Sequence, residues 1–433
     1  MKITVIGSGY VGLVSGICLA KIGHEVTCLD NDKDKIYQLS QGEIPIFEPG
    51  LKDLLGEVVA KNRIKFSVNL IDSIKDSKAI FIAVGTPQEE DGSADLKYVL
   101  QVAKDLAQNI NDDKVIITKS TVPAGTGKKI QEIFLQINPQ TKVSIASNPE
   151  FLREGFAIDD FMNPDRIVVG VEDEKAKEVL EEIYQYFSQE KLVFCDIITA
   201  ELIKYASNSF LATKIAFINE MADLCEIVGG DIRQLSYAMG LDSRIGNKFL
   251  NPGPGFGGSC FPKDILAILN VSQKNNVHLS LIESVIASNK ARINKMVAKI
   301  KKALNGDVVD KKIALLGLAF KANTDDIRYS PAIIIAKKLL ENRATIQAHD
   351  PQAITNSKKE LNGFKNIEYF NDYYQAIKDC DLIVIATEWD QYKELDFDKI
   401  KQLTKCRVVV DLRNLLTYSQ RRDREFTMVS IGK

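Results

Sequence analysis

The chain has 433 residues, of which 45% are hydrophobic and 26% charged, and its formal net charge at pH 7 is -2. This composition is typical of a globular protein, and the length suggests two or three domains. A charge so close to zero gives no electrostatic basis for binding nucleic acid or an anionic membrane. No apolar run is long enough to span a bilayer, and the N-terminus lacks the pattern of a signal peptide.

The seven cysteines are odd in number and never spaced as CxxC. We therefore expect a cytoplasmic protein without disulfides, a metal site, or nucleic-acid or membrane partners.

The first elements predict a βαβ unit. A short buried-strand pattern over 2–6 leads into a glycine turn, a helix over 11–22 and a second strand over 25–30. Further strand patterns alternate with helical ones, and they lie at 79–85, 115–121 and 143–150. Strands that alternate with helices indicate a parallel, doubly wound sheet.

The turn after the first strand, GSGYVG (7–12), has the spacing of a dinucleotide-binding fingerprint. Its glycines allow a tight turn, close approach of a pyrophosphate to the backbone, and close packing of helix on strand. Asp30 ends the second strand, where a carboxylate can bind both ribose hydroxyls and repel a 2′-phosphate. This favours NAD over NADP, although Lys35 could tolerate a phosphate. The residues that this pattern assigns to the cofactor are Gly7, Gly9, Tyr10, Val11, Gly12, Asp30 and Lys35.

Three later segments end strands of the same predicted sheet, and ligands bind at the carboxyl ends of such strands. Two are short turns, at 85–87 and 120–122, which give Thr86 and Thr121 as candidates but are also compatible with plain loops. The third, NPEFLRE (148–154), places Glu150 at the same edge. A glutamate after proline is also a common residue of a helical first turn, where the helix dipole stabilises it.

The segment 198–228 predicts one long helix without glycine or proline. It would extend on the order of 45 Å, and such a helix often joins two domains and supplies a dimer face, so we expect a homodimer. Lys204 and Asn208 are four residues apart and share one face of it. They are either solvated or aimed at an oxyanion.

At residue 311 the N-terminal pattern returns without a GxGxxG turn. The strand patterns 311–317, 345–350, 381–387 and 407–411 repeat those of the first domain. We interpret this as a second α/β domain that holds something other than a dinucleotide. The expected fold is α/β, with two Rossmann-like doubly wound parallel-sheet domains joined by a long central helix. The expected boundaries are 1–197, 198–300 and 301–433.

The stretch GPGFGGSCFPKD (253–264) surrounds Cys260 with glycines. If 261–270 is helical, with Pro262 near its first turn, Cys260 lies at the helix N-terminus. The helix dipole and Lys263 would then favour the thiolate, and Asp264 stands one turn away. A loop cysteine alone is usually inert, but this setting favours a nucleophile.

Together, NAD and a thiolate point to oxidation of an alcohol to an acid. A first hydride transfer gives an aldehyde, the thiolate adds to it, a second hydride transfer leaves a thioester, and water hydrolyses the thioester. The chain has only three histidines (24, 278 and 349), and none lies in a motif. Acid–base work is therefore expected from Lys, Asp or Glu.

At this point the sequence resembles the UDP-glucose 6-dehydrogenases, within the UDP-glucose/GDP-mannose dehydrogenase family. The resemblance covers essentially the whole chain and rests on the segments GSGYVG, GTP, KSTVPAGT, NPEFLREG, NPDRIVVG, ELIKYASNSFLATKIAFINE, SRIGNKFLNPGPGFGGSCFPKD, GLAFKANTDDIRYSP and ATEW. It implies a four-electron oxidation of C6 of UDP-glucose by two NAD, with NAD on the N-terminal domain and UDP on the C-terminal domain. Near the C-terminus the chain has VDLRNLL, which departs from the DGRN-like pattern usual around the residue equivalent to Arg413.

The resemblance also implies residue roles. The implied catalytic residues are Cys260, Lys204, Asn208, Asp264, Glu150 and Thr121, with the first base left open among Lys, Asp and Glu. Added to the cofactor residues are Thr86, Thr121, Glu154, Lys263 and Arg328. The implied substrate contacts are Glu150, Phe151, Leu152, Lys204, Asn208, Phe249, the segment from Asn251 through Gly255 to Phe256, Gly257, Cys260, Phe320 and Lys321, with Arg244 donated across the dimer.

Three alternatives remain open. A sister enzyme would act on GDP-mannose or a UDP-N-acetylhexosamine, although the residues around the cysteine favour UDP-glucose. A two-electron hydroxyacid dehydrogenase would need neither Cys260 nor a second α/β domain at 311–433. A non-catalytic NAD-binding protein would release no NADH with any sugar nucleotide.

Overall fold

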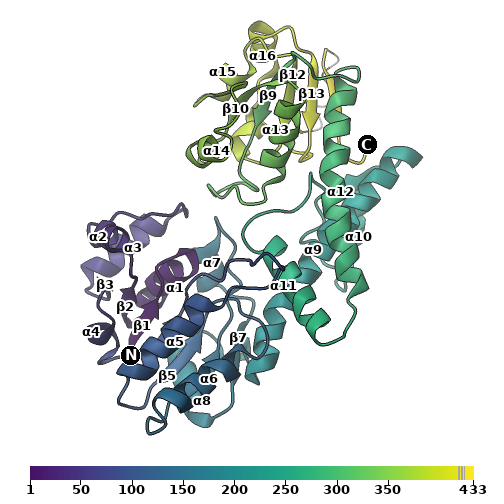
Figure 1. Cartoon of the computed structure of the whole chain (residues 1–433). Helices are drawn as coiled ribbons and strands as arrows, with labels where there is room; N and C mark the ends of the chain where they lie inside the picture. Colours follow the sequence, from purple (N-terminus) through teal and green to yellow (C-terminus); the bar gives the residue numbers. More distant parts are fainter. Residues whose placement is uncertain (418–419, 421–422, 424) are drawn as a thin grey trace. The chain divides into compact units, whose positions relative to one another are not determined.

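The computed structural model describes residues 1–417, 420, 423 and 425–433. These form two compact units, each built around one β-sheet (Figure 1). Unit 1 comprises Met1–Ser207 and Leu266–His278, and unit 2 comprises Asn208–Ile265 and Leu279–Lys433. Within the described residues, no helix has both the length and the apolar character needed to cross a membrane.

The sheet of unit 1 has eight strands in the order β3-β2-β1-β4-β5-β6-β7-β8. Their bounds are β1 Lys2–Ile6, β2 Glu25–Leu29, β3 Ile64–Ser67, β4 Ala79–Ile82, β5 Val115–Thr118, β6 Ser144–Ser147, β7 Ile167–Val171 and β8 Leu192–Cys195. Every neighbouring pair is parallel except β6 and β7, which run antiparallel. The carboxyl ends of β1 to β6 therefore lie along one edge of the sheet.

Strand β4 shows how this sheet separates two cores. Ala79 and Phe81 belong to one hydrophobic cluster, whereas Ile80 and Ile82 belong to another, and all four are buried. Because side chains alternate along a strand, helices must cover both faces of the sheet. These helices are α1 Tyr10–Lys21, α2 Lys33–Ser40, α3 Leu51–Ala60, α4 Leu70–Ile74, α5 Lys97–Asn109, α6 Thr126–Ile137, α7 Ala157–Met162, α8 Glu174–Ile183 and the 3₁₀ turn Gln189–Lys191.

Two long helices contribute residues to both units. Helix α9 spans Ile197–Val228, and helix α11 spans Phe261–Lys274. Unit 2 also contains α10 Ile232–Gly240 and α12 Ser280–Ala303. The predicted long central helix is confirmed, and the helix on which the argument about Cys260 depended is present as α11.

The sheet of unit 2 has six parallel strands in the order β11-β10-β9-β12-β13-β14. Its strands are β9 Lys312–Leu316, β10 Thr345–His349, β11 Ile367–Tyr369, β12 Leu382–Ile385, β13 Val408–Asp411 and β14 Thr427–Ser430. Its helices are α13 Pro331–Glu341, α14 Ile354–Glu360, α15 Tyr373–Ile377, α16 Phe397–Leu403 and the 3₁₀ turn Asp390–Glu394. The predicted fold class, two parallel-sheet α/β domains with a long central helix, is confirmed.

The strand patterns of the first domain end with 143–150, and the assignment of this segment as the last strand is wrong, because the sheet continues beyond it. The chain passes through a loop and the short helix α7, then adds β7 and β8. The strand patterns also left out β3, β11 and β14. Four of these five strands, β3, β8, β11 and β14, lie at sheet edges and are partly exposed, so their positions do not require a continuous run of buried apolar residues.

Candidate functional site

The fingerprint turn of unit 1 has the backbone that a pyrophosphate needs. Gly7 has φ +101°, and a Cβ there would lie 2.7 Å from the carbonyl oxygen of Ala83. A Cβ on Gly12 would overlap the carbonyl oxygen of Gly7, so both positions require glycine. Around Gly9, by contrast, no atom lies within 4 Å of a built Cβ. Gly9 caps α1 without a side-chain hydrogen bond, so an open cradle faces the positive end of the helix, and a dinucleotide fits there.

Asp30 follows β2 at the same edge of the sheet. Its carboxylate accepts hydrogen bonds from the backbone N–H of Ser8 (2.7 Å) and of Asp32 (3.1 Å), and from Lys35 Nζ (3.1 Å). Burial opposes its ionisation, but these donors hold its pKa below the usual value. The side chain is 10% exposed. A charged, partly accessible carboxylate in this place suits two ribose hydroxyls.

The second sheet has a carboxylate at the matching position, and its surroundings differ. Asp350 follows β10 and is buried. It accepts from the backbone N–H groups of Leu318, Ala319, Gln352 and Ala353, and from Trp389 Nε1. A carboxylate has about four lone-pair sites, so these five donors leave no capacity for a ribose. This agrees with the interpretation that the second domain holds something other than a dinucleotide.

Two threonines at the carboxyl ends of β4 and β5 are joined directly. Thr86 Oγ1 donates to the carbonyl oxygen of Thr121 at 2.9 Å. Ser120 Oγ donates to the carbonyl oxygen of Val84 at 2.7 Å. The two predicted turns therefore hold each other in place at the edge that carries the fingerprint.

Glu150 and Lys204 form a buried ion pair within unit 1. Lys204 Nζ lies 3.0 Å from Glu150 Oε1, and the two side chains are 4% and 5% exposed. Burial opposes the charge on Glu150. Even so, its pKa is lowered by the charge and hydrogen bond of Lys204, by the N–H of Leu152 (2.6 Å) and by the charge of Lys119. The Lys204 ammonium also lies 5.3 Å from the centre of the Phe151 ring. A charged carboxylate and an ammonium are thus held together where water is scarce, an environment often found at functional sites.

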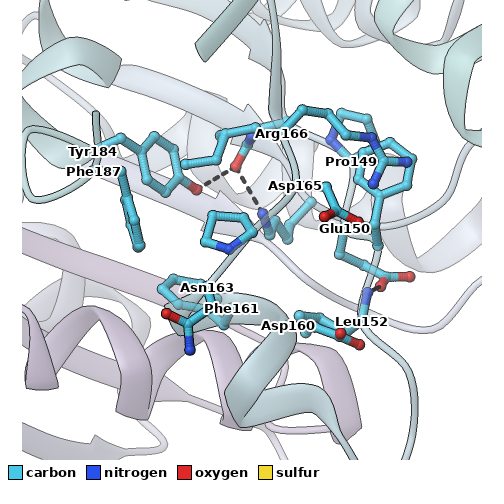
Figure 2. Close-up of a pocket in the computed structure, with 15 residues that line it drawn as sticks. Pro149, Glu150, Leu152, Asp160, Phe161, Asn163, Asp165, Arg166, Tyr184 and Phe187 are labelled. Carbon is cyan, nitrogen blue, oxygen red and sulfur yellow. Dashed lines mark hydrogen bonds between the residues drawn. The ribbon is translucent and has the colours of Figure 1, made fainter. Parts of the chain in front are cut away.

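Behind Glu150 lies a cavity of about 80 Å³ (Figure 2). On one side, Asn148 Oδ1 accepts hydrogen bonds from Lys119 Nζ (2.8 Å) and from the hydroxyl of Tyr184 (2.5 Å), the two dashed lines in Figure 2. On the other, the Arg166 guanidinium stacks on the Phe151 ring, 3.6 Å from its centre. We did not predict Lys119, Asn148, Tyr184 or Arg166 as site residues. Lys119 and Asn148 lie inside quoted motifs, whereas nothing in the sequence marks Tyr184.

Unit 2 brings together a second pair, on α9 and α11. Asn208 Nδ2 donates to Asp264 Oδ2 at 2.6 Å. Lys263 Nζ lies 2.5 Å from the other carboxylate oxygen of Asp264, whose side chain is 1% exposed. Lys263, predicted to favour the thiolate of Cys260, is therefore engaged with the neighbouring carboxylate.

Cys260 is the residue before α11, and its carbonyl oxygen accepts the first helical hydrogen bond, from the N–H of Asp264 at 2.9 Å. The cysteine is half-buried, and its sulfur lies 3.5 Å from Ser259 Oγ. The predicted position at a helix N-terminus is thus present. Such a position stabilises a thiolate.

Polar side chains on α12 hold the glycine-rich loop before the cysteine. Asn289 bonds both backbone groups of Phe256, at 2.9 and 3.0 Å. Arg292 Nε donates to the carbonyl oxygen of Gly253 at 2.9 Å. Gly255 has φ +124°, and a Cβ there would lie 2.8 Å from Asn289 Oδ1. Sequence reasoning missed both helical residues, because a polar residue on a helix carries no signal of a distant loop.

The same loop packs against the segment that contains Phe320. A Cβ on Gly258 would lie 2.7 Å from the Phe320 ring, and the N–H of Gly258 donates to the carbonyl oxygen of Arg328 at 2.8 Å. Arg328 itself pairs with Asp326. The Lys321 ammonium lies 5.4 Å from the centre of the Phe320 ring. The structure thus brings Phe320 and Lys321, predicted to contact the substrate, close to Gly258 and to Arg328, which was predicted to contact the cofactor.

Other predicted residues lie at the edges of these groups. Tyr10 donates its hydroxyl to Glu48, which also accepts from the N–H groups of Gly155 (2.6 Å) and Ala157 (2.7 Å) and so ties the fingerprint turn to the loop after Glu154. The Arg244 side chain is 86% exposed and pairs with the nearby Asp242. Val11 lies in the first turn of α1. Phe249, with φ +65°, and Asn251 and Gly257 lie in the irregular segment that leads to Cys260.

Three family models match the chain in succession. They are the NAD-binding domain (1–188), the central domain (198–291) and the UDP-binding domain (314–418) of the UDP-glucose/GDP-mannose dehydrogenase family. The chain is 48% identical to UDP-glucose 6-dehydrogenase of Rhizobium meliloti (strain 1021), with 100% of both chains covered. It is 45% identical to UDP-glucose 6-dehydrogenase TuaD of Bacillus subtilis (strain 168), covering 100% of this chain and 93% of that one. A solved UDP-glucose dehydrogenase from Pyrobaculum islandicum matches with a TM-score of 0.91 and 36% identity, covering 100% and 97%.

The fold, the fingerprint turn and the matches to known proteins together define an NAD-dependent oxidoreductase. The chain belongs to the UDP-glucose/GDP-mannose dehydrogenase family.

Proposed function

We propose that this protein oxidises C6 of UDP-glucose to UDP-glucuronate, consuming two NAD⁺ and one water and releasing two NADH and three protons. The observation that carries the proposal is the placement of Cys260 directly before α11, with Asp264 one turn on and bonded to Asn208. An alcohol oxidised only to an aldehyde needs no thiolate, whereas an alcohol oxidised to an acid benefits from one.

In the first oxidation a base takes the proton of the C6 hydroxyl as the hydride leaves. The Glu150–Lys204 pair is suited to this step, because it is buried and the carboxylate is held in its charged form. Residues such as Gly9 and Asp30 would hold NAD, which would supply the hydride acceptor for each of the two oxidations.

In the second half, the Cys260 thiolate adds to the aldehyde carbon, and the carbonyl electron pair moves to the oxygen. Lys204 and Asn208, one turn apart on α9, supply ammonium and amide donors for that oxyanion. Hydride loss from the thiohemiacetal leaves a thioester. Water that Asp264 orients then adds to the thioester carbon and loses a proton, the C–S bond breaks, and Cys260 leaves as the thiolate. Thr121 is proposed as a further water-holding residue of unit 1.

The choice of sugar nucleotide rests on the relatives. Those named UDP-glucose 6-dehydrogenase are 44–49% identical to this chain. The solved UDP-D-ManNAc dehydrogenase of Pyrococcus horikoshii is 25% identical, and the GDP-mannose dehydrogenase is 28% identical. This difference favours UDP-glucose over GDP-mannose or an N-acetylated sugar.

The deciding experiment counts NADH formed per UDP-glucose consumed, with NAD in excess and the reaction followed to completion. Two NADH per sugar is the expected result. One per sugar would mean that the reaction stops at the aldehyde and would remove the role of Cys260. No NADH with UDP-glucose, but NADH with GDP-mannose, would keep the mechanism and change the substrate.

Cys260→Ser should abolish net turnover, whereas the matched variant Cys195→Ser, at another half-buried cysteine, should retain it.

We also propose that the protein is a homodimer through α9. Phe210, Phe217 and Leu224 repeat every seven residues on this helix and are 66%, 45% and 50% exposed. Residues seven apart lie on one helical stripe, and an exposed apolar stripe of this kind commonly packs against another helix.

Light scattering over a range of protein concentrations tests this proposal. Phe217→Glu should shift the protein toward the monomer, because a carboxylate would be buried in the interface. Leu135→Glu, at an exposed leucine on α6, is the matched control and should leave the mass unchanged. A wild-type monomer at every concentration would rule the dimer out. The domain boundaries at 197 and 300 and the cytoplasmic location stay predictions.

A further inference from the structure

One buried cation near the candidate site has no role in the mechanism above. Lys119 follows β5 and is 6% exposed. Its ammonium donates to Asn148 Oδ1 at 2.8 Å and lies 6.0 Å from the centre of the Tyr184 ring. A buried ammonium is costly, and a single amide oxygen does not neutralise it. Burial accordingly lowers the pKa of Lys119 to about 8, while the charge of Glu150 opposes that shift.

The contacts of Lys119 connect it to the segment that carries Glu150. Asn148 stands two residues before Glu150, at the end of β6. Its oxygen accepts from Lys119 and Tyr184, and its Nδ2 donates to the carbonyl oxygen of Val168 on β7 at 2.7 Å. Three contacts on one amide therefore fix the backbone from which Glu150 extends.

The charged groups around Glu150 come from several elements. Lys204 reaches it from α9 at 3.0 Å, and Lys119 lines the same cavity from the end of β5. Three further charged side chains line the cavity, namely Asp160, Asp165 and Arg166. Asp160 pairs with Arg153, and Arg166 stacks on the Phe151 ring. Two lysines therefore act on the charge of Glu150: Lys204, which contacts it directly, and Lys119.

We propose that Lys119 is a positioning residue for the reaction: it fixes Asn148, and with it Glu150, and its ammonium provides a second positive charge for the Glu150–Lys204 pair. The proposal rests on the proposed function, in which Glu150 serves the reacting carbon. Lys119 itself touches neither substrate nor cofactor in this scheme. Its charge keeps Glu150 ionised at a pH where a buried carboxyl would otherwise take up a proton.

The test compares Lys119→Gln, which keeps a donor for Asn148 but removes the charge, with Lys119→Arg, which keeps the charge. The readout is the pH profile of kcat/KM for UDP-glucose. In Lys119→Gln the acid limb should move up by about one pH unit, because Glu150 loses one of its two cations. In Lys119→Arg the acid limb should stay in place. Tyr184→Phe removes one hydrogen bond from Asn148 without changing charge, so it should lower stability and leave the acid limb unmoved.

An unmoved acid limb in Lys119→Gln, or an equal shift in Tyr184→Phe, would overturn the proposal and leave Lys119 a purely structural residue. If Lys119→Gln does not fold, Lys119→Met replaces it, because methionine has no polar group to bury.

A direct titration separates this proposal from the proposed function. The carboxyl infrared band that Glu150→Gln removes reports the protonation of Glu150 without any turnover. Its midpoint should rise in Lys119→Gln, and an unchanged midpoint would overturn the role of Lys119. Full activity of Glu150→Gln would instead overturn the role of Glu150 in the proposed function, while the midpoint would still decide whether Lys119 sets its charge.

Discussion

Replacing Lys204 with methionine would remove the ammonium that lies 3.0 Å from Glu150 and leave the carboxylate in place. Both side chains are at most 5% exposed, so water cannot take over the role of the lost partner. Methionine has a similar length and fills the space of the lysine stem. The variant therefore isolates the charge and tests whether the buried pair stabilises unit 1.

Breaking a buried ion pair by removing one partner costs about 3–5 kcal/mol. For a folding unit of 150–250 residues this corresponds to a fall in Tm of very roughly 10 °C, at about 2–4 °C per kcal/mol. The cost should depend on pH. In the wild type the pKa of Glu150 lies below its usual value of 4.5, so its contribution to stability is present above pH 4.5 and is lost as the pH falls through the lowered pKa. Without Lys204, burial dominates and the folded pKa rises above 4.5. The sign then reverses, and stability falls as the pH rises from 4.5 through the raised pKa.

Thermal unfolding followed by circular dichroism at pH 5 and pH 8 measures this difference. Lys204→Met should lose more stability relative to wild type at pH 8 than at pH 5. The double variant Glu150→Gln/Lys204→Met carries no charge in the pair, so the extra loss at pH 8 should disappear. An equal loss at both pH values in the single variant, or a loss below about 1 kcal/mol, would refute the reasoning.

Three other outcomes follow from the geometry. Asp30→Asn should raise the ratio of kcat/KM for NADP to that for NAD at least about tenfold, because charged hydrogen bonds are worth about 1.5–3 kcal/mol. The double variant Asp30→Asn/Lys35→Ala should lose this increase in the ratio. An unchanged ratio in Asp30→Asn would contradict the proposal that Asp30 selects NAD over NADP. Gly12→Ala should lower the free energy of unfolding in urea by about 1–3 kcal/mol and weaken NAD binding, because its Cβ would overlap the carbonyl oxygen of Gly7. A wild-type dissociation constant for NAD would argue against that crowding. Arg292→Met should lower kcat while leaving NAD affinity unchanged, because Arg292 holds the loop before the cysteine, and normal turnover would show that the loop does not need it.

The candidate site shows where prediction from sequence succeeded. The glycine spacing of 7–12 and the acid at the end of the second strand are local patterns. In the structure Gly7 has the positive φ that the turn needs, and Asp30 accepts a hydrogen bond from the backbone of that turn. A helix over 261–270, with Pro262 near its first turn, was the condition for placing Cys260 at a helix N-terminus, and a helix does begin at Phe261. In each case the residues that decide the structure lie within one or two turns of one another.

Prediction failed where distant segments meet. The sequence did not mark Lys119 or Asn148 as site residues, yet these two residues, 29 apart in the chain, are hydrogen-bonded beside Glu150. Likewise, Asn289 lies 33 residues from Phe256, the residue whose backbone it holds. No periodic pattern in the sequence predicts either contact.

The sequence by itself determined the βαβ order, the long helix α9 and the position of Cys260 before α11. Periodicity, glycine conformation and helix capping act over a few residues, so the chain encodes them locally. Only the tertiary structure decided which polar side chains meet, such as Glu150 with Lys204 and Asn208 with Asp264. The partners in each pair are more than fifty residues apart, and packing of sheet and helices, rather than any local preference, brings their side chains within hydrogen-bond distance.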